Sequence, residues 1–213
     1  MKVISVLNQK GGVGKTTISI HLARAIELSG KSVALVDSDP QGTARDWNAA
    51  NEDSTLTVVG IDRPTIDKDI KNLLSDRDYV IIDGAPSIES LSVSAIKASD
   101  VIIIPVQPSP FDVWATNDLV DLIKQRIEIT EGRLQAFFVV SRAIKGTSIA
   151  NEVHDALNEL ELPVLNSVVH QKVDKKTGYL TAVGRGLTVM EINPNGDESK
   201  EINNLLNEII SKL

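Results

Sequence analysis

The segment LNQKGGVGKTT, residues 7–17, constrains the fold of this chain more than any other stretch. It places three glycines within four residues, between the apolar, β-branched run 2–8 and a helical pattern of apolar residues over 16–29. Glycine lets a turn curl around an anion, and the backbone N–H groups of such a turn converge with the positive end of the following helix. The sequence therefore predicts a strand, an anion-binding turn and a helix, in that order.

The spacing in this turn departs in one place from the common phosphate-binding pattern G-x-x-x-x-G-K-[ST]. Gln9 stands where the first glycine is usual, and Lys10 adds a second lysine to Lys15. We expect Lys15 to reach the phosphates of a nucleotide and the Thr16 hydroxyl to hold Mg²⁺. A glycine-rich turn without a ligand is the alternative, but strand, turn, lysine and hydroxyl together favour a nucleotide. The nucleotide-binding residues expected here are Lys10, Gly11, Gly12, Val13, Gly14, Lys15, Thr16 and Thr17.

The rest of the chain alternates apolar runs with helical patterns. The runs do not alternate polar and apolar residues, which is typical of parallel strands covered on both faces. Together they predict an α/β fold with a doubly wound, mostly parallel sheet, helices on both faces and right-handed crossovers. The 213 residues, 42% of them hydrophobic, suffice for a single domain over 1–213. The runs are 2–8, 32–37, 56–61, 78–84, 100–106, 134–140 and 162–169, and the helical patterns include 16–29, 64–74, 90–98, 116–127, 148–160 and 199–213.

A magnesium site on phosphates also needs a carboxylate at the end of a neighbouring strand. The segment YVIIDG supplies Asp83 after four residues of an apolar strand. A buried strand that ends in aspartate is common by itself, so the prediction of a metal ligand here depends on the glycine-rich turn.

The second lysine has two interpretations. Lys10 lies on the outer curve of the turn, where it is not expected to reach phosphates already held by Lys15. It could instead act on the nucleotide of a second subunit, because a cation brought against a terminal phosphate stabilises the charge of phosphoryl transfer. The alternative is a solvated loop lysine, and the physical argument leaves both open.

Composition excludes several classes of protein. The chain has no cysteine, which removes thiol nucleophiles, disulfides and iron–sulfur clusters. Its net charge of -7 means that binding to nucleic acid would require a localised basic patch. The N-terminal apolar run is too short for a signal peptide, and the polar face of the last helix, 199–213, lacks the lysines and arginines of a membrane-surface helix. We therefore expect a cytoplasmic protein that does not bind membranes.

Several segments together carry a family resemblance. KGGVGKTT (10–17) resembles the deviant Walker A motif of the ParA/MinD superfamily, which does not require the first glycine. LVDSDPQG (35–42) is similar to the D-x-D-P-Q segment of ParA-type ATPases, and DGAPS (83–87) resembles the end of their Walker B strand. IIIPVQPSPFDV (102–113) and GLTVMEI (186–192) fit the same family, so the resemblance spans nearly the whole chain.

The resemblance implies a P-loop NTPase fold and a weak ATPase that uses ATP and Mg²⁺ and is stimulated by a partner. It implies that Lys10 contacts the nucleotide of the partner subunit in an ATP sandwich homodimer. It also implies that Asp39 positions the attacking water and Asp37 supports the metal site, beside Thr16 and Asp83. Ser141 and Arg142 occupy the region where relatives approach the adenine.

Within the superfamily the chain resembles the small ParA, or ParF-like, plasmid partition proteins. Iron–sulfur members need cysteines, and larger partition proteins carry a helix-turn-helix before the ATPase, whereas the first strand here begins at Lys2. The implied cycle is ATP-driven dimerisation, nonspecific DNA binding or higher assembly on the nucleoid, and release triggered by a centromere-binding, ParB-like or ribbon-helix-helix partner. Such a cycle segregates plasmid or chromosomal DNA. The alternative is a ParA-like ATPase that positions a protein cargo or a cell-division component.

The basic stretch from His170 to Gly186 is a candidate DNA contact. Phosphate contacts from such a patch would double in a dimer and give a steep salt dependence. A solvated basic loop is the alternative, and Lys172 replaces an arginine usual in relatives. The candidate residues are Lys172, Lys175, Lys176 and Arg185.

Overall fold

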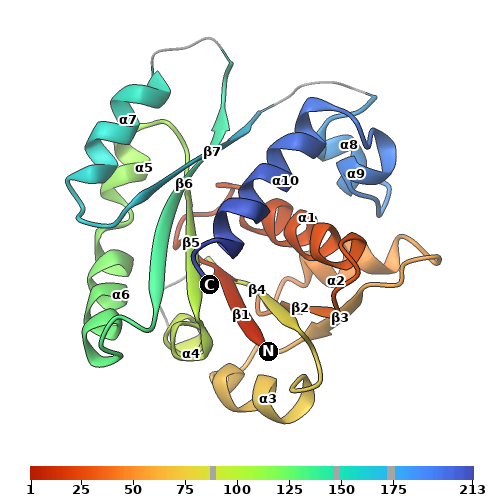
Figure 1. Ribbon diagram of the computed structural model, residues 1–213, viewed down its shortest axis with the longest axis horizontal. Coiled ribbons are helices and arrows are strands. Elements are labelled where there is room, and N and C mark those ends of the chain that lie inside the picture. Colours follow the sequence, from red (N-terminus) through yellow and green to blue (C-terminus); the bar gives the residue numbers. More distant parts are fainter. Residues whose placement is uncertain (87–89, 146–148, 172–175) are drawn as a thin grey trace.

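The computed structural model describes residues 1–86, 90–145, 149–171 and 176–213. Its seven strands form one sheet in the order β3-β2-β4-β1-β5-β6-β7, in which every neighbouring pair is parallel (Figure 1). Each predicted apolar run coincides with one strand, although β6 and β7 extend past the predicted ends, to Ala143 and His170. The parallel pairing confirms the prediction of a parallel sheet. The strands are β1 (Lys2–Val6), β2 (Val33–Asp37), β3 (Thr57–Gly60), β4 (Tyr79–Asp83), β5 (Val101–Val106), β6 (Gln135–Ala143) and β7 (Val164–His170).

Helices cover both faces of the sheet, as a doubly wound fold requires (Figure 1). One buried apolar cluster joins the sheet to five of them: α1 (Lys15–Leu28), α2 (Thr43–Ala49), α8 (Tyr179–Val183), α9 (Val189–Ile192) and α10 (Asp197–Ile210). A second cluster on the opposite face holds the others: α3 (Ile66–Leu73), α4 (Ser90–Ala98), α5 (Pro110–Trp114), α6 (Asn117–Ile129) and α7 (Ile149–Asn158). The sheet is therefore buried on both sides, which is why its strands read as continuous apolar runs.

The six longer helical patterns all form helices, whereas α2, α5, α8 and α9 were not predicted. These four have between four and seven residues, fewer than two full turns, and so show too little of the 3.6-residue period to be recognised.

The last helix packs inside the fold. The apolar stripe of α10 is buried at Ile202, Leu205, Leu206 and Ile209, against α1 and β7. Among the described residues, no helix combines the length and apolarity needed to cross a bilayer.

The order of the strands places one crevice at the centre of the sheet. The chain runs outward from β1 to β2 and β3, returns through β4 beside β1, and then continues to β5, β6 and β7 on the other side. Ligands of open parallel sheets bind at the carboxyl ends of the strands where the order reverses. The glycine-rich turn follows β1 at this point, and the register sets Val6 and Asp37 beside Asp83.

Candidate functional site

The turn between β1 and α1 has the predicted anion-binding geometry. Gly12 and Gly14 have φ of 77° and 95°, in the left-handed region that glycine adopts without strain. Gly14 is the N-cap of α1, where no side chain caps the helix and the first turn carries no acidic residue. The positive end of α1 is therefore open to an anion.

Side chains from the ends of β5 and β6 fix the curvature of this turn. Gln107 Nε2 and an Arg142 guanidinium nitrogen donate to the Gly12 carbonyl at 3.0 and 2.7 Å. Ser141 Oγ donates to the Val13 carbonyl at 2.7 Å. Arg142 itself has φ of 55°, an uncommon conformation for a residue with a side chain. The turn is thus held from outside, by residues about 95 to 130 positions away in the chain.

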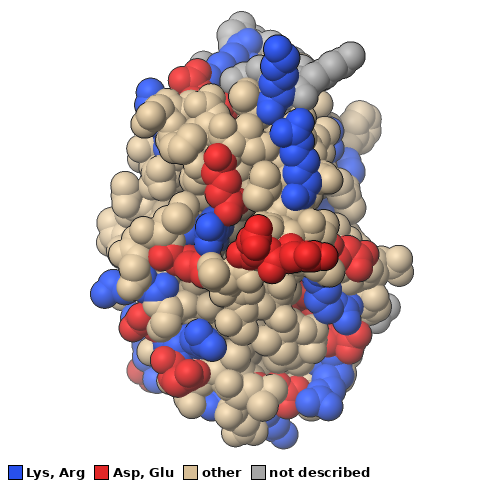
Figure 2. All heavy atoms as spheres, turned by 90° about the vertical axis from the view of Figure 1, so that its right-hand side faces the viewer, with Lys and Arg blue, Asp and Glu red and all other residues tan. Residues whose placement is uncertain are grey.

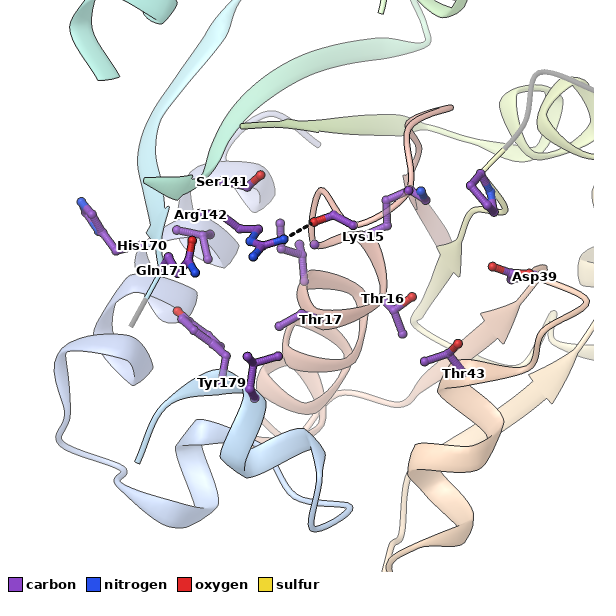
Figure 3. Close-up of a pocket in the computed structure, with 17 residues that line it drawn as sticks. Lys15, Thr16, Thr17, Asp39, Thr43, Ser141, Arg142, His170, Gln171 and Tyr179 are labelled. Carbon is purple, nitrogen blue, oxygen red and sulfur yellow. Dashed lines mark hydrogen bonds between the residues drawn. The ribbon is translucent and has the colours of Figure 1, made fainter. Parts of the chain in front are cut away.

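A pocket of about 420 Å³ opens in front of the turn and the N-terminus of α1 (Figure 3). This volume is within the range of sites for small molecules and cofactors. Nine of the predicted site residues line it: Gly11, Gly12, Gly14, Lys15, Thr16, Thr17, Asp39, Ser141 and Arg142. Sequence reasoning missed the remaining lining residues: Ile18, Thr43, Pro86, Val169, His170, Gln171, Tyr179 and Leu180.

Tyr179 is held at the far end of this pocket by the packing of the C-terminal segment. Its ring and that of His21 on α1 form a T-shaped pair with 5.1 Å between centroids, and its hydroxyl donates to the Glu198 carbonyl and to Glu201 at 3.3 Å each. No local sequence signal marks Tyr179 and Leu180, because they reach the pocket only when α8 packs on α1.

Lys15 is 7% exposed, and its Nζ donates to the Lys10 carbonyl at 3.0 Å. Burial lowers the pKa of Lys15, while attraction to Asp83 and Asp39 raises it. A phosphate in the pocket would further stabilise the charged form of Lys15, since it adds the opposite charge beside a desolvated amine.

Asp83 lies fully buried at the end of β4. Burial raises its pKa to about 7, while the approach of the Thr16 and Ser19 hydroxyls lowers it and the neighbouring Asp37 raises it further. Ser19 Oγ donates to Asp83 Oδ1 at 3.1 Å, and within the described part of the chain Asp83 Oδ2 has no hydrogen-bond partner. An unpartnered carboxylate oxygen near a threonine hydroxyl fits a Mg²⁺ ion, which prefers one or two protein oxygens together with phosphate oxygens and water.

The described residues hold no cluster of three or more histidine, aspartate or glutamate side chains suited to a metal. A metal in this pocket would therefore need ligands from the phosphates, as the combination of Thr16 and Asp83 suggests.

Asp37 lies beside Asp83, but both of its oxygens serve the loop that follows β2. Oδ1 accepts the Asp39 N–H at 3.1 Å, and Oδ2 accepts the N–H groups of Ala44 and Arg45 at 3.1 and 3.0 Å. Because its carboxylate already anchors this loop, the geometry of Asp37 fits a supporting role. Asp39 lines the pocket, with Oδ1 accepting the Gln41 N–H at 2.9 Å.

Lys10 does not line its own pocket. Its Nζ lies 2.9 Å from Asp112 Oδ2 on α5, with the Lys10 side chain 40% and the Asp112 side chain 5% exposed. Sequence reasoning did not identify Asp112, because the pairing depends on how α5 packs against the turn.

Only part of the candidate DNA patch lies within the described residues. Lys172 and Lys175 lie outside the described residues, and Lys176 and Arg185 are exposed. Lys145, which precedes this region, pairs with Asp197 and Glu201 of α10 at 3.2 and 3.6 Å. Figure 2 shows the right-hand side of Figure 1, where a band of acidic side chains interrupts the basic ones.

Known proteins are similar to this chain over most of its length. The model of the CobQ/CobB/MinD/ParA nucleotide binding domain matches residues 4–182. A protein of Halothiobacillus neapolitanus named "Maintenance of carboxysome distribution protein A" is 31% identical over 212 residues, covering 97% of this chain and 95% of the relative.

Solved structures share the fold. Apo McdA of Cyanothece superposes with a TM-score of 0.78 at 18% identity, covering 98% of this chain and 99% of that chain. Cobyrinic acid a,c-diamide synthase of Mycobacterium smegmatis, solved with an ATP analogue and magnesium, gives a TM-score of 0.72 at 24% identity, covering 86% and 93%.

Proposed function

Because this chain belongs to the CobQ/CobB/MinD/ParA nucleotide-binding family, we propose that it binds Mg²⁺ and ATP in the pocket beside β1 and α1 and hydrolyses the ATP. The observation that carries the proposal is that the buried Lys15 amine lies within electrostatic reach of Asp83, whose Oδ2 accepts no hydrogen bond from the described residues. A triphosphate with Mg²⁺ supplies the charge and the coordination that both groups lack. The ATP analogue and magnesium in the M. smegmatis relative support this choice of ligand.

In this proposal each group of residues in the pocket has a separate role. The backbone N–H groups of the turn and the positive end of α1 hold the phosphates, and Lys15 neutralises their charge. Thr16 and Asp83 hold Mg²⁺, which stabilises negative charge on the phosphate oxygens when bound. Asp39 lines the pocket on the same side as Thr43 (Figure 3) and orients the attacking water.

We further propose that two copies dimerise with ATP between them and that Lys10 then contacts the nucleotide of the partner subunit. Support comes from geometry: Lys10 points away from its own pocket and onto α5. A cation supplied across an interface fits phosphoryl transfer, which depends on positioning and charge stabilisation. Hydrolysis would stay slow until a partner protein completes the site.

Two kinds of cargo are candidates for an ATPase that dimerises in this way. DNA segregation with a centromere-binding partner follows from the ParA resemblance. Positioning of a protein compartment is favoured by the name of the 31%-identical relative, which refers to carboxysome distribution. The proteins encoded next to this gene discriminate: a small basic DNA-binding protein supports the first candidate, and a structural protein of a compartment supports the second.

Calorimetric titration with Mg²⁺ and a nonhydrolysable ATP analogue, followed by a turnover assay with ATP, tests the proposal. Lys15→Ala should weaken binding about tenfold to a hundredfold, which corresponds to the loss of one or two charge-assisted hydrogen bonds. Lys31→Ala, an exposed lysine beyond α1, is the matched control and should bind like the wild type. Equal affinity of Lys15→Ala and wild type would contradict the proposal.

A further inference from the structure

The loop between β2 and α2 brings Asp39 to the pocket, and Arg45 on α2 folds back over this loop. The guanidinium of Arg45 donates from Nη2 to the Asp39 carbonyl at 3.1 Å. Its Nε lies 3.4 Å from Asp37 Oδ2, the oxygen that also accepts the backbone N–H of Arg45. One side chain thus joins both aspartates of the loop.

Two glycines make room for this guanidinium. Gly60, at the end of β3, pairs in register with Asp37, and a Cβ at Gly60 would lie 2.8 Å from Nη1 and 3.0 Å from Cδ of Arg45. A Cβ at Gly42 would lie 3.1 Å from Nη2. Any larger residue at position 60 must therefore displace the Arg45 side chain.

The contacts of Arg45 act on the loop rather than on the ligand. Arg45 does not line the pocket, whereas Asp39 does. The loop also bends at Gly42, which has φ of 71° and accepts the N–H of Asp46 as α2 begins. With Arg45 in place, the Asp39 carbonyl is anchored on one side and the Asp39 carboxylate faces the pocket on the other.

We propose that Arg45 is a positioning residue for ATP hydrolysis: by clamping the Asp39 carbonyl to Asp37, it holds the Asp39 carboxylate where it orients the attacking water. This role rests on the proposed function of the pocket. Lys15 and the glycine-rich turn bind the phosphates without Arg45, so loss of the clamp lowers kcat and leaves ATP affinity unchanged. Misplacing a catalytic group by about 1 Å costs up to about a hundredfold in rate.

A double-mutant cycle between Arg45 and Gly60 tests the clamp. Arg45→Ala removes the guanidinium, and Gly60→Ala displaces it while leaving it in the protein. Each single variant should lower kcat for Mg²⁺–ATP about tenfold or more, with KM and the affinity for a nonhydrolysable analogue within about twofold of the wild type. In the double variant Gly60→Ala should add no further loss, because the side chain it displaces is gone.

Two further measurements separate positioning from general stability. Amide hydrogen exchange of the nucleotide-free protein should speed up over residues 38–44 in both single variants and stay unchanged over the glycine-rich turn. Arg63→Ala, which removes an exposed arginine paired with Asp69 at 2.9 Å, is the matched control and should leave kcat and exchange over 38–44 unchanged.

The outcomes are distinguishable. A wild type that binds no Mg²⁺–ATP would overturn the proposed function itself. A wild type that turns over ATP, with Arg45→Ala at the same kcat per folded molecule, would overturn only the role of Arg45. Additive losses in the double variant would also overturn it, since they would show that Gly60→Ala acts independently of the guanidinium.

Discussion

Lys10 and Asp112 form an ion pair that joins the glycine-rich turn to α5, with Nζ and Oδ2 2.9 Å apart. The aspartate is buried and the lysine partly exposed, so the pair lies at the rim of the core. Within the described residues, Asp112 Oδ1 has no hydrogen-bond partner, which makes Lys10 the main compensation for this carboxylate. Contact of Lys10 with a second subunit would require this pair to break.

Asp112→Asn should therefore favour dimerisation. The substitution removes the charge that holds Lys10 on its own subunit, and an asparagine tolerates burial better than an unpaired carboxylate. We expect the ATP concentration that gives half-maximal dimer to fall about threefold to tenfold, as measured by light scattering. A variant that dimerises less readily than the wild type would show that the pair supports the dimer instead.

Lys10→Ala should have the opposite pattern. ATP binding by the monomer should persist, because Lys10 does not line the pocket, while ATP-driven dimerisation and turnover should be lost. The folded state should also lose about 1–3 kcal/mol, since Asp112 would be left buried without its partner. Urea unfolding of Lys10→Ala and of the double variant with Asp112→Asn measures this cost, which the second substitution should relieve.

Asp83→Asn should change how stability depends on pH in the metal-free protein. The pKa of Asp83 is raised from 3.8 to about 7, so between these values the folded state holds a proton that the unfolded state has released. Stability of the wild type is therefore lost as pH rises through this window, by up to about 1.4 kcal/mol per pH unit. Asp83→Asn lacks this term, and its stability relative to the wild type should rise from pH 5 to pH 7 in urea unfolding with EDTA. A pH-independent difference would contradict the ionisation of this buried carboxyl.

His21 should make folding stability depend on pH in the opposite direction. Its ring is fully buried between Thr17 and Val189: Nδ1 donates to the Thr17 carbonyl at 2.6 Å, and Nε2 accepts the Val189 N–H at 3.2 Å. Burial lowers its pKa from 6.5 to about 4. The unfolded state binds the proton first, so stability is present above pH 6.5 and is lost as pH falls toward 4. In His21→Gln this acid-sensitive slope should disappear, alongside a pH-independent loss of about 1–3 kcal/mol.

Glu208 should stabilise the edge strand β7 without affecting the pocket. Its carboxylate accepts the backbone N–H groups of Asn166 and Ser167 at 2.8 and 2.9 Å, at an irregularity in the pairing of β6 with β7. Burial opposes the charged form, but these hydrogen bonds prevail and lower the pKa of Glu208. Glu208→Gln should cost about 1–2 kcal/mol in urea unfolding with unchanged ATP affinity. Asn203→Ala, on an exposed part of the same helix, is the control and should cost less than about 0.5 kcal/mol.

Part of this site follows from sequence alone. The glycines of the turn, Lys15, Thr16 and Asp83 were predicted from a strand, a turn and a helix whose signals are local. A glycine allows a turn through its own backbone conformation, and the position of a residue that ends a buried strand is set by that strand. The parallel sheet was predicted for the same reason, because continuous apolar runs report burial on both faces.

The rest depends on packing between distant segments. Several contacts form only when two distant elements meet in one register. They are the Lys10–Asp112 ion pair, the hydrogen bonds of Gln107 and Arg142 to Gly12, and the packing of Arg45 against Gly60. Two of these residues, Arg45 and Asp112, lie on the short helices α2 and α5, which have no periodic signal of their own. Local sequence thus determined the glycine-rich turn and the kind of sheet. Only the tertiary structure decided which side chains surround them, because such contacts are set by the strand order and register of the whole sheet.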